Sequence, residues 1–182
     1  WSSTEPNLIA IDISNLSTSE TSDVFIDANE IVSGTGFNNT AIRATFFSET
    51  DLTISNHFLL DEDGNRFASI TMRGDQNVGL DLSLQGGDFK SIVINDNNLD
   101  FTDDDGTAIL FDRLDGPALV SVNNNVMQMT NNFILSLPGE RGIVFNTVTN
   151  IGGVSLSGTG NTFTVFPVSD VFSTPFSPVG LF

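Results

Sequence analysis

Short stretches in which apolar and polar residues alternate recur along most of the chain. Their apolar positions are Ile42-Ala44-Phe46, Leu52-Ile54, Ile70-Met72, Leu80-Leu82-Leu84, Ile92-Ile94, Ile109-Phe111, Val120-Val122, Ile143-Phe145, Val154-Leu156 and Phe163-Val165. Alternation over a few residues predicts strands with one buried face. Glycine, asparagine and aspartate separate the stretches, and no window carries the apolar stripe of a capped helix. The pattern therefore predicts an all-β protein.

The alternating stretches form a loosened repeat. Its clearest copy runs from Gly142 to Phe163, and an earlier copy runs from Ala108 to Met127. An asparagine follows a strand in each copy, and these asparagines are Asn56, Asn97 or Asn98, Asn125 and Asn161. A self-similar unit predicts coils that stack on one another, with equivalent asparagines bonded in a ladder. The repeat favours a right-handed parallel β-helix, a solenoid, with an antiparallel β-sandwich as the alternative.

The sequence pattern at the beginning of the chain differs from the pattern in its middle. Residues 1–36 contain one strand pattern that places Ile9, Ile11 and Ile13 on one face, followed by a stretch rich in serine and threonine. We interpret this segment as an N-terminal cap or assembly segment, because a solenoid needs a covered end, and a flexible linker is the alternative. Residues 37–168 are the predicted β-solenoid.

The end of the chain is an apolar tail, residues 169–182. Three prolines from Pro167 onward exclude a central strand or a helix there. An extended apolar segment either folds back over the last coil or inserts into the next subunit. The side chains expected to make such assembly contacts are Phe172, Phe176, Val179, Leu181 and Phe182.

The charge balance limits the possible partners. The net charge is −17, from 23 acidic and six basic residues, and Lys90 is the only lysine. Nucleic-acid binding needs clustered lysine and arginine, so it is not expected. No apolar run approaches the roughly 20 residues of a membrane-spanning helix, so membrane insertion is not expected either. The first residue is Trp1, so we expect either a cleaved signal peptide or trimming of a longer protein, and the absence of cysteine excludes disulfides.

Two acidic loops are candidate calcium sites, because calcium prefers several converging oxygen ligands. The first supplies Asp61, Asp63 and Asn65 at alternate positions, as the opening of an EF-hand loop does, but its closing glutamate is missing. The second supplies the carboxylates of Asp100, Asp103 and Asp105. The alternative is that both loops are solvated turns, in which aspartate and glycine stabilise the backbone locally. Calcium is thus the only cofactor that the sequence suggests.

The sequence contains no assembled catalytic group. His57 is the only histidine and lies within a strand pattern, so a triad or a histidine-rich zinc site is not expected, and a structural histidine is. The acidic residues offer too many pairs to single out a glycosidase dyad. We expect that the protein is not an enzyme, and we assign no catalytic residue.

The phrase Gly142-Ile143-Val144-Phe145, followed by Val154-Ser155-Leu156 and Asn161-Thr162-Phe163, resembles the right-handed parallel β-helix repeats of the pectin-lyase-like superfamily. The versions in bacterial surface adhesins and autotransporter passengers are most similar. The resemblance covers roughly residues 40–165. It implies a fold and a secreted setting, and no catalytic residue can be carried over.

The sequence thus predicts an extracellular structural protein that assembles with itself into a filament or surface fibre. Open strand edges and apolar segments at both ends motivate this hypothesis. A carbohydrate-binding or adhesive module of a larger surface protein, with surface glycans as partners, is the alternative function.

Overall fold

The computed structural model describes residues 2–3, 5–102, 105–131, 141–149 and 152–167. Every regular element in these residues is a β-strand. The described residues contain no helix with the length and apolar character needed to cross a membrane. The prediction of an all-β protein is confirmed.

Three sheets contain all but two of the strands, and their neighbouring strands run parallel. Sheet 1 consists of β2 (Ile9–Asn15), β5 (Thr40–Phe46), β10 (Val78–Leu84), β13 (Thr107–Asp115) and β16 (Arg141–Thr149). Sheet 2 consists of β3 (Ser22–Asp27), β6 (Thr50–Ser55), β11 (Lys90–Asn95), β14 (Ala118–Asn123) and β17 (Val154–Thr159). Sheet 3 consists of β1 (Ser2–Ser3), β4 (Ile31–Ser33), β9 (Ile70–Arg73), β12 (Asn98–Thr102), β15 (Val126–Asn131) and β18 (Thr162–Pro167). The parallel pairing rules out the antiparallel sandwich.

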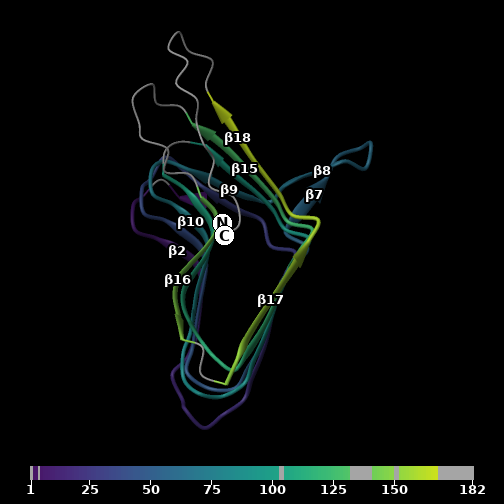
Figure 1. Cartoon of the computed structure of the whole chain (residues 1–182). Helices are drawn as coiled ribbons and strands as arrows, with labels where there is room; N and C mark the ends of the chain where they lie inside the picture. The colour runs from purple at the N-terminus through teal and green to yellow at the C-terminus, as the bar shows by residue number, and fades with distance from the viewer. Residues whose placement is uncertain (1, 4, 103–104, 132–140, 150–151, 168–182) are drawn as a thin grey trace.

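The chain visits sheets 1, 2 and 3 in turn and then returns to sheet 1 beside the strand it has just made. One passage through the three sheets is called a coil here. Coil 1 is β2–β3–β4, coil 2 is β5–β6–β9, coil 3 is β10–β11–β12, coil 4 is β13–β14–β15 and coil 5 is β16–β17–β18. Figure 1 looks along this stack, so that the three sheets form three sides around a common interior. The arrangement fits a parallel β-helix or solenoid.

Coil 2 carries an excursion from the corner between sheets 2 and 3. Strands β7 (Phe58–Leu60) and β8 (Arg66–Ala68) pair antiparallel as a hairpin that projects away from the stack (Figure 1). The Arg66 guanidinium lies 4.0 Å from the centre of the Phe58 ring, and its Nη1 lies 3.1 Å from Asp96 Oδ1 of coil 3. These contacts tie the base of the hairpin to the stack.

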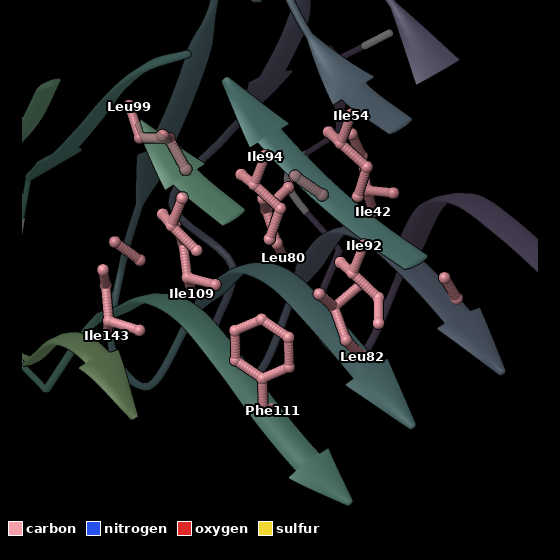
Figure 2. Packing of buried hydrophobic residues seen from close by; sticks show 14 of the residues in the cluster. Ile42, Ile54, Leu80, Leu82, Ile92, Ile94, Leu99, Ile109, Phe111 and Ile143 are labelled. Atoms are coloured by element: carbon pink, nitrogen blue, oxygen red, sulfur yellow. The ribbon is translucent and has the colours of Figure 1, made fainter. Parts of the chain in front are cut away.

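Apolar side chains fill the interior in columns that run across the coils. Figure 2 shows the columns from sheet 1, in which Leu80 pairs with Ile109 and Leu82 with Phe111, facing Ile92 and Ile94 from sheet 2. Each column residue covers the one in the coil before it, and the Phe111 and Phe145 rings stack with centres 4.6 Å apart. Alternation in the sequence therefore becomes alternation between the interior and the outer faces.

Coil 1 is formed by residues that the sequence assigned to the N-terminal segment 1–36. Its strands pair in register with those of coil 2, and Ile11 and Ile13 lie beside Ile42 and Ala44. Both are partly buried against the core. Their role as a cap or assembly segment stays a prediction, since the segment is built as a coil whose outer edge belongs to β2 and β3 in sheets 1 and 2.

Candidate functional site

The corner between sheets 2 and 3 is built from the same two-residue unit in every coil. The first residue has a positive φ, and the five are Ala28 (52°), Asn56 (57°), Asp96 (56°), Asn124 (54°) and Gly160 (70°). Asparagine, aspartate and glycine visit this left-handed region at low cost, which explains most of the column. The unit turns the chain sharply and points the next side chain into the corner.

The second residues of the unit form a ladder of polar side chains. They are Asn29, His57, Asn97, Asn125 and Asn161, one from each coil. The sequence predicted Asn56 as a ladder residue, which is wrong by one residue. It gave Asn97 and Asn98 as alternatives for the next rung, and the structure shows that Asn97 is the ladder residue. Asn56 has the positive φ instead, and His57 takes the inward place.

The asparagines are bonded in one direction along the stack. The backbone N–H and the Nδ2 of Asn97 both donate to Asn125 Oδ1, at 3.1 and 2.8 Å, and those of Asn125 donate to Asn161 Oδ1, at 3.1 and 3.0 Å. The other Nδ2 hydrogen points back to a strand carbonyl, such as Ile54 O for Asn97 and Val122 O for Asn161. Asn97 and Asn125 thus each join the coil before them to the coil after them, which satisfies polar groups in a buried corner.

His57 is fully buried and bonded at both ring nitrogens. Its Nδ1 lies 2.7 Å from Asn97 Oδ1 and its Nε2 lies 3.3 Å from Asn29 Nδ2. The bonds fit a neutral ring in which Nδ1–H donates to the Asn97 oxygen and Nε2 accepts from the Asn29 amide. Desolvation lowers the pKa of His57, and the Asn97 bond and the Asp27 charge oppose this shift. His57 is therefore a structural histidine, as the sequence indicated.

Lys90 is a further buried polar residue that the alternation pattern did not identify. Lys90 lies at an inward position at the start of β11, and its Nζ donates to Gly86 O at 2.8 Å and to Asp88 O at 2.6 Å. Burial lowers the pKa of Lys90, while the charges of Asp115 and Asp88 act against this shift. The lone lysine thus closes the corner between sheets 1 and 2 in coil 3.

Coil 5 differs from coils 2 to 4 because some of its inward side chains, Phe145 and Leu156 among them, are partly exposed. Leu156 is 52% exposed, although it occupies the column of Leu52, which is 1% exposed. Two hollows of about 240 Å³ and 180 Å³ lie at this end of the stack. Their linings are mainly apolar and include Met127, Val120, Val122, Ile143, Phe145, Leu156 and Phe163. This open end of coil 5 is the candidate assembly surface.

The two ends of the stack also differ in charge. Residues 1–33 contain six carboxylates and no lysine or arginine, and the carboxylates are Glu5, Asp12, Glu20, Asp23, Asp27 and Glu30. Residues 141–167 contain no carboxylate and one basic residue, Arg141. An acidic end and a nearly neutral end can approach each other with far less repulsion than two acidic ends.

The first calcium candidate lies at the tip of the β7–β8 hairpin. There Asp61 Oδ1 accepts the backbone N–H groups of Asp63 and Asn65, at 3.0 and 2.8 Å, and Asp61 Oδ2 accepts the Asn65 Nδ2 at 3.0 Å. These bonds lower the pKa of Asp61, the Asn65 side chain contributing most. Asp61 thus stabilises its own turn, and its role in calcium binding stays a prediction.

The second calcium candidate is described only in part. Asp100 lies in β12, where burial raises the pKa of its carboxyl and Arg73 counteracts this. Asp105 has a φ of 62°, and Asp103 lies outside the described residues. Within the described ranges no group of three histidine, cysteine, aspartate or glutamate side chains is placed to hold a metal ion. The expectations of calcium and of no catalytic activity both stay predictions.

The predicted contacts of the tail cannot be placed. Phe172, Phe176, Val179, Leu181 and Phe182 all lie outside the described residues. Of the predicted assembly residues, the structure describes Ile9, Ile11 and Ile13, which lie in β2 at the edge of sheet 1, and their role in assembly stays a prediction.

Comparison with known proteins identifies no relative. No protein-family model matches the chain, and no curated protein and no solved structure is significantly similar to it. The site is accordingly interpreted from its own geometry.

Proposed function

We propose that the protein is a secreted structural subunit of a self-assembling filament or surface fibre at the cell exterior. Its fold would be a right-handed β-solenoid whose subunits join head to tail through the coil ends and the termini. The pectin-lyase-like resemblance, with its surface adhesins, is consistent with this setting and stays an expectation. The C-terminal tail is expected to strengthen the joint.

The observation that carries the proposal is the open end of coil 5. Phe145 and Leu156 occupy columns that form the core in coils 2 to 4, yet in coil 5 both are partly exposed. An apolar end with unpaired parallel strands favours association with another strand-bearing surface. A contact between two different surfaces that does not close on itself produces a fibre.

Negative-stain electron microscopy of the purified protein, with and without calcium, tests the proposal. We expect filaments, and more of them in added salt or calcium, because the charge of −17 per subunit repels at low ionic strength. Light scattering during size-exclusion chromatography gives the mass in the same buffers. Monodisperse monomers in both conditions, unchanged by deletion of residues 169–182, would contradict it.

The alternative, a carbohydrate-binding or adhesive module, has one supporting observation. Phe25 is 76% exposed on the outer face of sheet 2, and Phe89 is exposed near the same face. Exposed rings offer stacking surfaces for sugars. Binding of the monomer to a glycan array, lost on Phe25→Ala, would favour this function over the filament.

A further inference from the structure

We propose that the open end of coil 5 binds coil 1 of a second copy of this chain in one fixed register. Strands β16, β17 and β18 would pair in parallel with β2, β3 and β4 of the second copy. This inference rests on the proposed function and deepens it, because it names the two surfaces, their direction and the residues that meet.

The apolar columns supply the first argument. In sheet 2 one inward column contains Val24, Leu52, Ile92, Val120 and Leu156 in order along the stack. Placing Val24 of the second copy after Leu156 continues this column and covers the most exposed inward side chain of coil 5. In sheet 1 the same shift places Ile11 and Ile13 of the second copy after Ile143 and Phe145. The joint would therefore be a copy of the contacts between coils.

The polar ladder supplies the second and more specific argument. In each inner rung, the asparagine N–H and one Nδ2 hydrogen donate to the side-chain oxygen of the next coil. Asn161 repeats the backward bond, from Nδ2 to Val122 O at 2.7 Å, but no described coil follows it to accept the forward bonds. At the other end, Asn29 directs its Nδ2 to Asp27 O and His57 Nε2, and its Oδ1 is the atom that corresponds to the acceptor oxygens of Asn125 and Asn161. Asn161 would thus donate to Asn29 Oδ1 of the second copy.

Charge and strand direction together set the orientation of the contact. A head-to-tail joint brings the six carboxylates of residues 1–33 against residues 141–167, which carry Arg141 and no carboxylate. A joint between two N-terminal ends would oppose six carboxylates to six, and a two-fold joint would also pair strands antiparallel and interrupt the ladder. The second copy is therefore bound in the same orientation as the first.

The proposed joint requires that strand β1 be displaced from its place beside β4. Strand β1 lies beside β4 at the outer edge of sheet 3, where β18 of the preceding copy would lie. The pairing of β1 consists of Ser2 with Val32 and Ser3 with Ser33, whereas β18 has six residues. We expect the longer strand to displace the shorter one, since it offers more backbone hydrogen bonds to β4.

Engineered cysteines test the register, because the natural chain contains none. Phe25 and Ser157 occupy one outward column through Thr53, Val93 and Ser121, so the joint places them on adjacent strands of two copies. Adjacent parallel strands lie about 4.8 Å apart, within the Cα separation of roughly 4.4–6.8 Å that a disulfide needs. The double variant Phe25→Cys with Ser157→Cys is the test protein.

The matched control shifts the register by two residues. Phe25→Cys with Ser155→Cys also places both cysteines on the outer face of sheet 2, but the Cα atoms across the joint would be roughly 8 Å apart. Under mild oxidation we expect the in-register variant to give a ladder of covalent multimers and about tenfold more product than the shifted variant. A mixture of the two single variants, Phe25→Cys and Ser157→Cys, should give covalent dimers and nothing larger.

The other outcomes overturn the inference. Equal cross-linking of both double variants would show an unspecific contact, and dimers of either single variant alone would show a two-fold joint. Filaments in the microscope without in-register cross-linking would leave the proposed function standing and refute this joint, whereas monomers throughout would refute both. Cross-linking that appears only after deletion of residues 168–182 would show that the chain's own C-terminal segment occupies the surface. Circular dichroism of each variant confirms that the strands are retained.

Discussion

Coils 3 and 5 share one design and differ in their surroundings. In coil 3, Leu80, Leu82, Ile92 and Ile94 are fully buried between neighbouring coils. In coil 5, the matching Phe145 is only partly buried and Leu156 is half exposed, because within the described structure coil 4 covers them from one side. Each coil of a stacked repeat contributes half of two interfaces, so burial is a property of the pair of coils and not of one coil. The same alternating sequence is therefore fully buried in the middle of the stack and partly exposed at its end.

Truncating two leucines of the same column tests the difference in burial between the middle and the end of the stack most directly. Leu52→Ala in coil 2 should lower the free energy of unfolding of the monomer by about 3 kcal/mol, because it leaves a cavity in a fully packed interior. Leu156→Ala should cost under about 1 kcal/mol in the monomer, because that side chain is half exposed. Urea unfolding followed by circular dichroism measures both.

The same pair also separates stability from assembly. Leu156→Ala should weaken filament formation although the monomer stays folded, whereas Leu52→Ala should affect both. Equal losses of monomer stability would show that the end of coil 5 is as well packed as the middle, and the comparison would fail.

Removing ladder residues should have the next largest effect. Asn125→Ala removes the acceptor of the Asn97 N–H and Nδ2 and one of the two bonds to Asn161 Oδ1, and we expect a loss of about 2 kcal/mol. Asn161→Ala removes a rung bonded to one described coil and should cost about half as much in the monomer. Thermal unfolding at dilute concentration compares the two, and a cost for Asn161 that exceeds that of Asn125 would contradict the one-sided position of this rung.

The smallest expected effect concerns pH. Since burial holds the folded-state pKa of His57 below its ordinary 6.5, the unfolded chain binds the proton more readily than the folded chain does. Stability should be highest above the unfolded pKa and should fall as the pH decreases from about 7 toward the depressed folded pKa. His57→Asn places the side chain of the other rungs at this position, and its melting temperature should lose this component of the pH dependence. An unchanged profile in the variant would assign the dependence to the carboxylates instead.

The sequence was sufficient to predict the alternation, the repeat and most inward positions, because period-two burial is a local property of each strand. It did not distinguish Asn56 from His57, since the positive φ and the inward rung are adjacent and asparagine suits both. The sequence also did not predict the β7–β8 hairpin. Phe58 follows His57 in what looked like one strand, but in the structure the chain leaves the stack at this corner and forms the hairpin.

Two further features depended on tertiary context. Lys90 is buried because the carbonyls of Gly86 and Asp88 meet its ammonium group, and their position follows from the corner and not from the pattern. Residues 9–33 appeared different from the repeat because a stretch rich in serine and threonine follows their first strand pattern. Pairing with coil 2 depends on the inward residues, so coil 1 forms with the same register.

The direction of the strands has a mechanical consequence. Every strand of the three sheets lies across the stack, so tension applied along its axis acts on one coil boundary at a time. Neighbouring coils begin 38 residues apart at Thr40 and Val78 and 29 apart at Val78 and Thr107. Each coil that peels off would release about 100–130 Å of slack. A filament of such subunits would unfold coil by coil under tension and would dissipate a sudden load before it ruptured.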